Sequence, residues 1–269
     1  MSRDPLYDLK RRGALLSQHS AMRCPPNCQR PGCQRQDLLV EVTLLDLWVL
    51  SQRLGKPVVD LFPDPVSLRL GPSPGWPFRK RMVLALKKPC PFLTETLCSV
   101  YEARPIPCAL FPENISLDPG RLSAFGSEED FAEYHCLKAL PSVSEERRQI
   151  LLALEKKVSA ERFVTQLTLF GDSPFLIDFS QEAPSLSEPA EPGGKGPRVV
   201  RHQNLEALFQ ERLAKGSFSS LVRERMSAMD KDPEPCFALV REMEQNCGAF
   251  EVSRSFHRIT PEGKIEKNV

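Results

Sequence analysis

Cysteine is the residue type whose number and spacing in this chain most clearly indicate chemistry. The chain has nine cysteines in 269 residues, and most of them fall in two tight groups, at 24–33 and at 90–108. The seven that lie in or near these groups are Cys24, Cys28, Cys33, Cys90, Cys98, Cys108 and Cys136. Soft thiolates select zinc or iron–sulfur clusters over Mg²⁺ or Ca²⁺, and one centre takes about four of them. We therefore predict that these seven residues supply the ligands of a metal centre.

Whether the cysteines form disulfides, bind metal, take part in catalysis or are simply buried depends on the redox state of the cellular compartment. The first residues, MSRDPLYDLKRRGALLSQHSAMRC, lack the apolar core of about 7–15 residues that a signal peptide has, and no run approaches the ~18 apolar residues of a membrane span. We therefore expect a cytoplasmic protein, in which reducing conditions disfavour structural disulfides. Metal ligation, catalysis and plain burial remain. Three thiols within ten residues, followed by three more in a Pro-rich segment, favour ligation over burial.

Charge excludes some classes of partner. The chain has 36 Lys and Arg against 35 Asp and Glu, so it has no global field that would attract nucleic acid or anionic lipid. Short basic runs, at 79–81 and at Lys87–Lys88, are interpreted as solvated surface. The partners that remain are a protein partner or a protein substrate; we expect neither a membrane nor a nucleic acid.

The elements that must position the first thiols can be predicted from local patterns. The stretch LLVEV at 38–42 is short and partly alternating, as a strand would be. Thr43 as N-cap, Asp46 at the third helical position and Gly55 as C-cap predict a helix between them.

The next segment leads to the second thiol group. A helical turn is predicted at 58–62 and a strand at 82–86. Between them, the many Pro and Gly residues of 63–78 predict an irregular loop.

The second half is mostly helical by pattern. Ser142 and Glu145 form a predicted capping box for a helix over 143–169 that ends before Gly171, either unbroken or as two joined helices. Further helices are predicted at 203–214, 218–229 and 233–246. Residues 181–199 are rich in Pro, Gly, Ser and Glu, which predicts a flexible linker.

The segment PCPFLTETLCSVYEARPIPCALFP resembles the signature of the YkgJ-type cysteine-cluster family, which is described as zinc- or iron-chelating and includes the flagellin lysine N-methylases. In that family an N-terminal cysteine cluster is followed by a pattern close to C-x-F-L, then C-x-I-Y-x-x-R-P-x-x-C-R-x-F-P, then a further Cys. The matching positions here are Cys90, Phe92, Leu93, Cys98, Tyr101, Arg104, Pro105, Cys108, Phe111 and Pro112.

The resemblance covers residues 20–140 and has two departures. The first cluster, Cys24-x3-Cys28-x4-Cys33, lacks the tandem cysteines of the family, and Ala109 stands where Arg is usual. One family ligand is therefore missing, which leaves the size of the metal site open.

Two residues near Cys98 are candidates for contacts to the cofactor. Tyr101 and Arg104 could place a hydroxyl and a guanidinium beside sulfur, where hydrogen bonds tune a cluster. Alternatively, the ring of Tyr101 is a core residue and Arg104 caps backbone carbonyls before Pro105.

The metal is predicted to be an iron–sulfur cluster, with Zn²⁺ as the alternative. Structural zinc sites draw thiolates from two short knuckles, whereas the later cysteines here are separated by seven and nine residues. His135 beside Cys136 could add an imidazole. Cys236 and Cys247 are expected to be buried, because a helix over 233–246 would separate them by about 16 Å along its axis.

These predictions combine into an α+β fold: a small irregular metal-stapled domain at 15–175, a linker at 181–199, a helical segment at 200–250 and a tail at 251–269. The predicted function is metal or iron–sulfur binding, in redox or protein-modification chemistry. Two alternatives stay open: a lysine N-methylase-like enzyme that uses the cluster, and a structural zinc protein that recruits a partner through its C-terminal helices. Whether the chain is an enzyme is left open.

Overall fold

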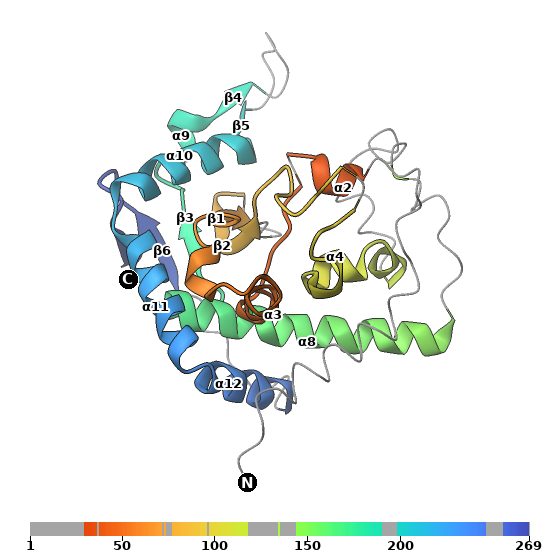
Figure 1. Ribbon diagram of the computed structural model, residues 1–269. Helices are drawn as coiled ribbons and strands as arrows, with labels where there is room; N and C mark the ends of the chain where they lie inside the picture. Colours follow the sequence, from red (N-terminus) through yellow and green to blue (C-terminus); the bar gives the residue numbers. More distant parts are fainter. Residues whose placement is uncertain are drawn as a thin grey trace.

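The computed structural model describes residues 30–36, 38–71, 73, 77–95, 97–117, 134, 144–189, 198–245 and 255–268. The chain combines helices with short strands, and three helices follow one another before the last two strands (Figure 1). The α-helices are α2 (Pro31–Gln34), α3 (Leu44–Leu54), α4 (Ile106–Leu110), α8 (Glu145–Phe170), α9 (Ala183–Leu186), α10 (His202–Lys215), α11 (Phe218–Lys231) and α12 (Glu234–Gln245). The 3₁₀ helices are η1 (Val58–Leu61), η2 (Tyr101–Ala103) and η3 (Glu113–Leu117). The strands are β1 (Val66–Gly71), β2 (Arg79–Leu86), β3 (Leu176–Asp178), β4 (Glu188–Pro189), β5 (Arg198–Val199), β6 (Phe256–Ile259) and β7 (Ile265–Asn268).

One five-stranded mixed sheet organises the described chain. Its strand order is β1-β2-β3-β6-β7, and all neighbours are antiparallel except β3 and β6. β1 and β2 pair in register from Val66–Leu86 to Gly71–Arg81. The predicted α+β fold with a helical C-terminal segment is therefore confirmed.

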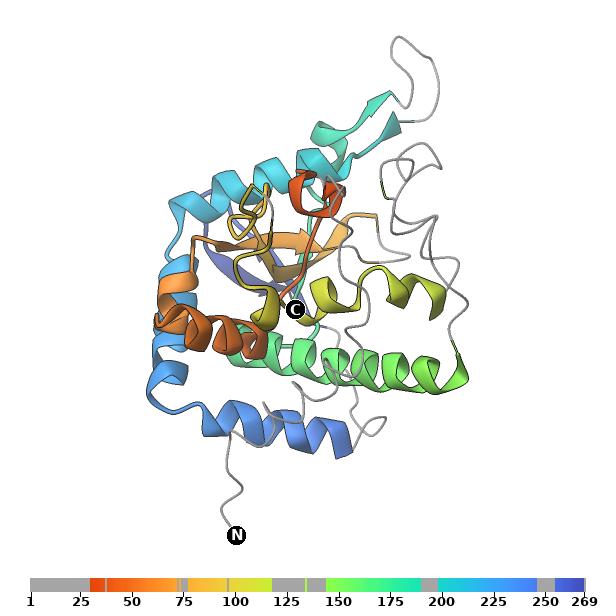
Figure 2. The ribbon, with the colours of Figure 1, turned by 45° about the vertical axis from the view of Figure 1, so that its right-hand side comes forward.

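Helices cover the sheet and bury its apolar residues. α8 is the long helix in Figures 1 and 2; α3, α11 and α12 pack against it. Alternate residues of β1 and β2 are fully buried and belong to the same core as α3, α10, α11 and α12. They are Val66, Leu68, Leu70, Met82, Leu84 and Leu86. β1 thus has the period of two of a strand with one face on a core, whereas Val83 and Ala85 of β2 are also buried, so both faces of the second half of β2 are covered.

The helix predicted after residue 42 is confirmed, including its ends. The hydroxyl of Thr43 accepts a hydrogen bond from the backbone N–H of Asp46 at 3.1 Å, and the Asp46 carboxylate accepts one from the backbone N–H of Thr43 at 2.9 Å. Gly55 ends α3 in the left-handed region, at φ 63°. Local sequence alone is enough to define this helix.

Other local predictions need correction. Residues 38–42 make only an isolated bridge, between Glu41 and Ala85, rather than a full strand. The predicted loop at 63–78 is wrong over residues 66–71, which form β1. The alternation of apolar with polar residues there outweighs the flanking prolines, which lie outside the strand. α8 begins after Ser144, whose hydroxyl accepts from the Arg147 N–H, and not after Ser142.

α10 covers the free edge of β1. Glu206 accepts a hydrogen bond from the Leu70 N–H at 2.8 Å and pairs with Arg69 at 2.6 Å, and Gln210 donates to the Leu68 carbonyl at 2.7 Å. These side chains satisfy edge groups that would otherwise attract another strand. The segment predicted at 200–250 thus packs directly on the sheet, against a strand from the first half of the chain.

The predicted linker and tail also contain regular structure. Within 181–199, the described residues form α9 and the β4–β5 pair, and Glu182 makes a buried ion pair with Arg212 of α10 at 2.7 Å. The expected tail contains β6 and β7, which complete the sheet. Strands of two to four residues carry too short an alternation to be recognised locally, and β6 also depends on the distant strand β3.

Candidate metal centre

Four of the seven predicted ligands lie in the described part of the chain. They are Cys33 in α2, Cys90 and Cys98 in the irregular segment after β2, and Cys108 in α4, and all four are half-buried. The other three, Cys24, Cys28 and Cys136, lie outside the described residues, as does His135.

Backbone contacts join the Cys33 turn to the Cys90 segment. The backbone N–H of Cys90 donates to the carbonyl of Cys33 at 2.8 Å, and Lys88 donates from Nζ to the carbonyl of Gly32 at 2.6 Å. Both bonds cross more than fifty residues of sequence. They place two predicted ligands from different groups side by side.

Cys98 closes a small turn that begins near Cys90. Leu93 and Cys98 form an isolated bridge, and the backbone N–H of Ser99 donates to the carbonyl of Phe92 at 2.9 Å. The Tyr101 N–H then donates to the Cys98 carbonyl at 3.2 Å, which begins η2. Cys90, Cys98 and Cys108 all pack against the main hydrophobic core, so the prolines of this segment do not leave it extended into solvent.

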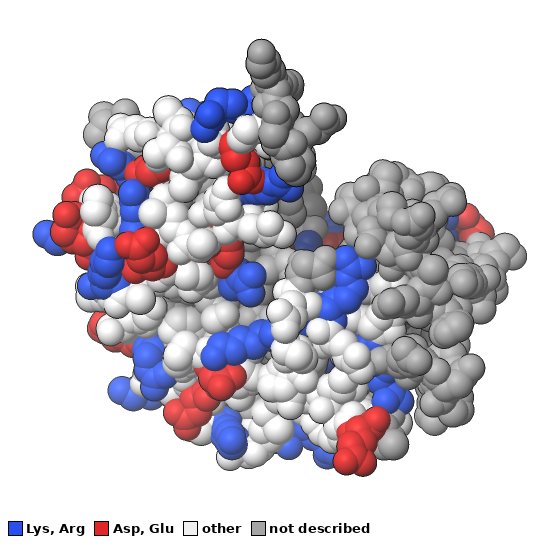
Figure 3. All heavy atoms as spheres, turned by 90° about the horizontal axis from the view of Figure 1, so that it is seen from above, with Lys and Arg blue, Asp and Glu red and all other residues white. Residues whose placement is uncertain are grey.

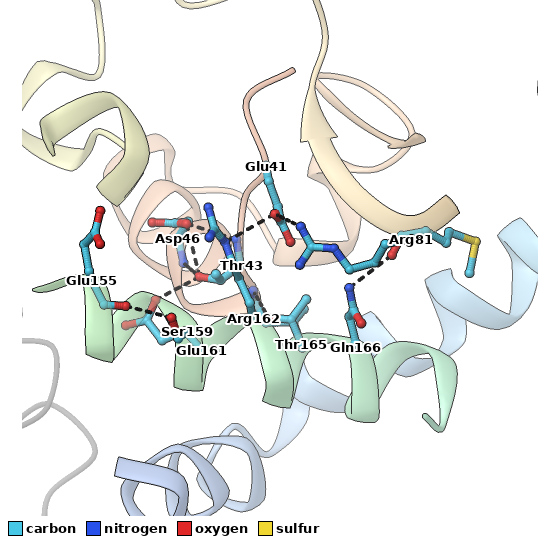
Figure 4. A network of polar contacts seen from close by, with 12 residues as sticks. Glu41, Thr43, Asp46, Arg81, Glu155, Ser159, Glu161, Arg162, Thr165 and Gln166 are labelled. Atoms are coloured by element: carbon cyan, nitrogen blue, oxygen red, sulfur yellow. Dashed lines mark hydrogen bonds and ion pairs between the residues drawn. The ribbon is translucent and has the colours of Figure 1, made fainter. Parts of the chain in front are cut away.

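Asp46 connects α3 to the start of α4, which carries Cys108. Its carboxylate oxygen Oδ1 accepts a hydrogen bond from the backbone N–H of Ile106 at 2.9 Å. Figure 4 shows the surrounding network: Thr43 donates to Glu161 of α8 at 3.0 Å, and the Leu44 N–H donates to Thr165 at 2.9 Å. α4 is therefore fixed relative to α3, and α3 relative to α8.

A second part of this network fixes Glu41, the residue that forms the isolated β-bridge with Ala85. Its carboxylate pairs with Arg81 of β2 at 2.7 Å and with Arg162 of α8 at 3.3 Å (Figure 4). Gln166 of α8 donates to the Met82 carbonyl at 3.3 Å. Polar contacts thus fix the sheet, α3 and α8 into one support beneath the thiol segments.

Charged groups and thiols from three other segments lie near enough to Cys108 to affect the pKa of its thiol. Burial raises the pKa of the Cys108 thiol to about 12. The ammonium of Lys88 lowers that pKa, while Cys90, Cys33 and Asp46 each raise it further. These groups act on one thiol only because they lie near it, although they come from segments far apart in sequence.

Tyr101 and Arg104 lie together in and just after η2. Arg104 donates from Nε to the Tyr101 carbonyl at 3.0 Å, and its guanidinium lies 3.7 Å from the centre of the Tyr101 ring. This is the carbonyl-capping alternative for Arg104. The Tyr101 hydroxyl is buried and has no hydrogen-bond partner among the described residues, which is unusual for a polar atom inside a protein.

The residue types fit a thiolate-bound metal, but the described residues do not close a site. No group of three or more His, Cys, Asp or Glu side chains within the described ranges is arranged so that it could hold a metal ion. What supports a fit is the donor chemistry: three thiols near one another, a fourth on the adjoining turn, and a buried hydroxyl without an acceptor. A cluster sulfide or a ligating thiolate is an acceptor of the kind that this hydroxyl lacks.

Cys236 lies apart from this group, as predicted. It is 6% exposed in α12 and hydrogen-bonded to Thr168, and burial raises the pKa of its thiol to about 12. Its expected burial is confirmed, whereas Cys247 lies outside the described residues.

Two residues of the site were not singled out from the sequence. Asp46 was interpreted only as part of the α3 capping box, and Lys88 as solvated surface. The proximity of Lys88 to Cys90 was the available signal, whereas nothing local links Asp46 to Ile106, which lies 60 positions away.

The described surface agrees with the charge balance of the sequence. On the face shown in Figure 3, Lys and Arg lie interspersed with Asp and Glu, without a broad patch of one sign on the described atoms. None of the helices in the described part of the chain combines the length and the apolar composition that a bilayer crossing requires.

Comparisons with known proteins do not assign the chain to a family. No family model, no curated protein and no solved structure matches it. The resemblance to the YkgJ-type cysteine-cluster family therefore stays a prediction from the motif between residues 90 and 112.

Proposed function

We propose that this protein binds an iron–sulfur cluster, or alternatively Zn²⁺, through its clustered cysteine thiolates. The observations that carry the proposal are the 2.8 Å backbone bond that joins Cys90 to Cys33 and the electrostatic effect of both residues on the Cys108 thiol. Core packing alone does not explain why these thiols lie near an ammonium group, that of Lys88. The remaining predicted ligands are Cys24, Cys28, Cys98 and Cys136.

The cysteine spacing favours iron–sulfur over zinc. The later cysteines are widely spaced, whereas structural zinc sites draw on short knuckles. The buried Tyr101 hydroxyl lacks an acceptor among the described residues, and the sulfur of either kind of centre would supply one. When bound, an iron–sulfur cluster supplies one-electron redox chemistry or an open iron for a substrate.

The C-terminal helices contribute to the core of the protein. The apolar faces of α10, α11 and α12 are buried in the chain's own core, through Leu205, Phe209, Val222, Met226, Phe237 and Val240. These faces are thus occupied, which weakens the alternative in which the helices recruit a partner. Redox chemistry or modification of a protein, as the resemblance to lysine N-methylases implies, is the function that we favour.

The test is anaerobic purification of the full chain followed by measurement of iron, acid-labile sulfide and zinc per chain, with visible absorption. We expect iron and sulfide in similar amounts and a brown protein. A colourless protein with stoichiometric zinc would establish the alternative metal. A chain that retains neither metal under these conditions, and takes up neither when reconstituted, would overturn the proposal.

A further inference from the structure

Asp46 of α3 links the sheet and the long helix α8 to α4, the helix that carries Cys108. The side chain of Asp46 is completely buried, and its two carboxylate oxygens serve different segments. Oδ2 accepts from the backbone N–H of Thr43 at 2.9 Å and caps α3, while Oδ1 accepts from the backbone N–H of Ile106 at 2.9 Å.

The bond to Ile106 is not needed for capping α3. The capping box of that helix is complete with Thr43 and Oδ2 alone. α4, in contrast, has no capping side chain of its own, because Pro105 stands at its N-cap position. Asp46 supplies from another element the acceptor that α4 lacks, two residues before Cys108.

The geometry also requires a carboxylate rather than an amide. Both Asp46 oxygens face backbone N–H donors, and an ionised carboxylate accepts at both. An Asn at this position would turn its NH₂ group toward one of the two donors, so one bond would be lost. A buried N–H without an acceptor is costly, so the segment that loses its bond should move.

We propose that Asp46 is the positioning residue of the thiol centre: it fixes α4 against α3 and thereby holds Cys108 beside Cys33 and Cys90. The inference rests on the proposed function, since it concerns how the ligands of that metal are placed. Asp46 itself is not a ligand in this proposal.

The first test compares Asp46→Asn with Asp230→Asn in the full chain. Asp230 of α11 is a matched control, because its carboxylate also accepts two backbone N–H bonds, from Val58 at 2.7 Å and Val59 at 3.0 Å, and it lies outside the group that acts on Cys108. Metal-free proteins are titrated anaerobically with Co²⁺, whose thiolate charge-transfer and ligand-field absorption reports both affinity and geometry.

We expect Asp46→Asn to weaken Co²⁺ binding by about 10- to 100-fold, the range for residues that support metal ligands, and to change the spectrum at saturation. Asp230→Asn should lower the melting temperature but leave affinity and spectrum unchanged. Equal affinity and identical spectra for wild type and Asp46→Asn would overturn the proposal.

A second pair of variants covers the case in which Asp46→Asn fails to fold. Ile106→Pro removes the N–H that Asp46 accepts, and Pro is tolerated at the first position of a helix. Pro105 already has φ −50° and ψ 145°, the extended conformation that a residue before Pro adopts. Ile106→Ala is its control, since it loses the buried side chain but retains the N–H.

We expect Ile106→Pro to bind Co²⁺ more weakly than Ile106→Ala does. Its Co²⁺ spectrum should also differ from that of the wild type, whereas the spectrum of Ile106→Ala should not. Matching behaviour of these two variants would contradict the positioning role of Asp46. A wild-type chain that binds no Co²⁺, zinc or iron would instead reject the proposed function, and this inference with it. The two failures are therefore distinguishable.

Discussion

Cys108 and Cys236 are chemically similar thiols in two different regions. Both lie in helices, and burial raises the pKa of each to about 12. Around Cys236 the polar neighbours are Thr168, which shares a hydrogen bond with it, and Glu161. Around Cys108 there are two further thiols, an ammonium and a carboxylate. The raised pKa therefore does not distinguish a core cysteine from a candidate ligand, whereas the chemistry of the neighbours does.

The largest expected effect comes from removing each thiol in turn. Cys108→Ser should reduce metal affinity by more than about 100-fold, because even residues that only support ligands cost about 10- to 100-fold. Cys236→Ser should leave the metal content unchanged and reduce only thermal stability. Elemental analysis of the two anaerobically purified variants measures their metal content, and thermal unfolding measures their stability. Full metal occupancy in Cys108→Ser would mean that the two thiols do not differ in function.

A second prediction separates the stability of the scaffold from metal binding. At Gly216, a Cβ would lie 2.0 Å from the backbone oxygen of Gly263, far inside van der Waals contact. Gly216→Ala should therefore cost about 3 kcal/mol or more, and lower Tm by roughly 6–12 °C, with metal content unchanged in the folded protein. Gly55→Ala is the control: a Cβ there meets nothing within 4 Å, and only its φ of 63° costs about 1–2 kcal/mol. Thermal unfolding of both variants measures the difference; similar losses would show that the contact between the two glycines is not tight.

The third prediction concerns two neighbouring lysines. Lys88→Gln removes the bond to the Gly32 carbonyl and the positive charge beside Cys108, so we expect about tenfold weaker metal binding. Lys87→Gln is the matched control, because the Lys87 side chain is 44% exposed and, among the described residues, forms an ion pair with Asp64 at 3.6 Å and no contact with a predicted ligand. Co²⁺ titration of both variants measures this effect, and equal binding by the two would assign Lys88 to the solvated surface.

Elements with strong local signals were predictable from the sequence, and very short strands were not. The α3 capping box lies within four residues, and the apolar stripes of α10, α11 and α12 lie within single helices. β6 and β7 were missed because four-residue strands are specified mainly by their neighbours in the sheet.

The same distinction holds at the candidate site. The cysteines were predicted because residue type and motif identify them without any knowledge of the fold. Their convergence depends on contacts such as Cys90 with Cys33 and Asp46 with Ile106, which cross long stretches of chain. Arg104 shows the limit of motif reasoning: the sequence left open whether it contacts sulfur or caps a backbone carbonyl, and the structure shows the bond to the Tyr101 carbonyl and the stacking on the Tyr101 ring.

The smallest expected effect is a pH dependence located in the sheet, away from the thiols. His257 of β6 is 8% exposed and stacks on Phe175, with ring centres 3.9 Å apart. Burial lowers the pKa of this imidazole, an effect that Asp172 opposes and Lys267 reinforces. The folded state therefore favours the neutral ring, whereas the unfolded chain takes up the proton at a higher pH.

Stability should consequently fall as the pH decreases through the ordinary histidine pKa of about 6.5, because the unfolded state then binds more protons than the folded state. His257→Phe keeps an aromatic ring against Phe175 but removes the titration. Between about pH 7.5 and pH 5.5, Tm of this variant should decrease by about one or two degrees less than that of the wild type. His202, whose pKa is also lowered by burial, is present in both proteins and cancels in the comparison. Thermal unfolding across this pH range is the measurement, and parallel pH profiles would show that His257 does not couple protonation to folding.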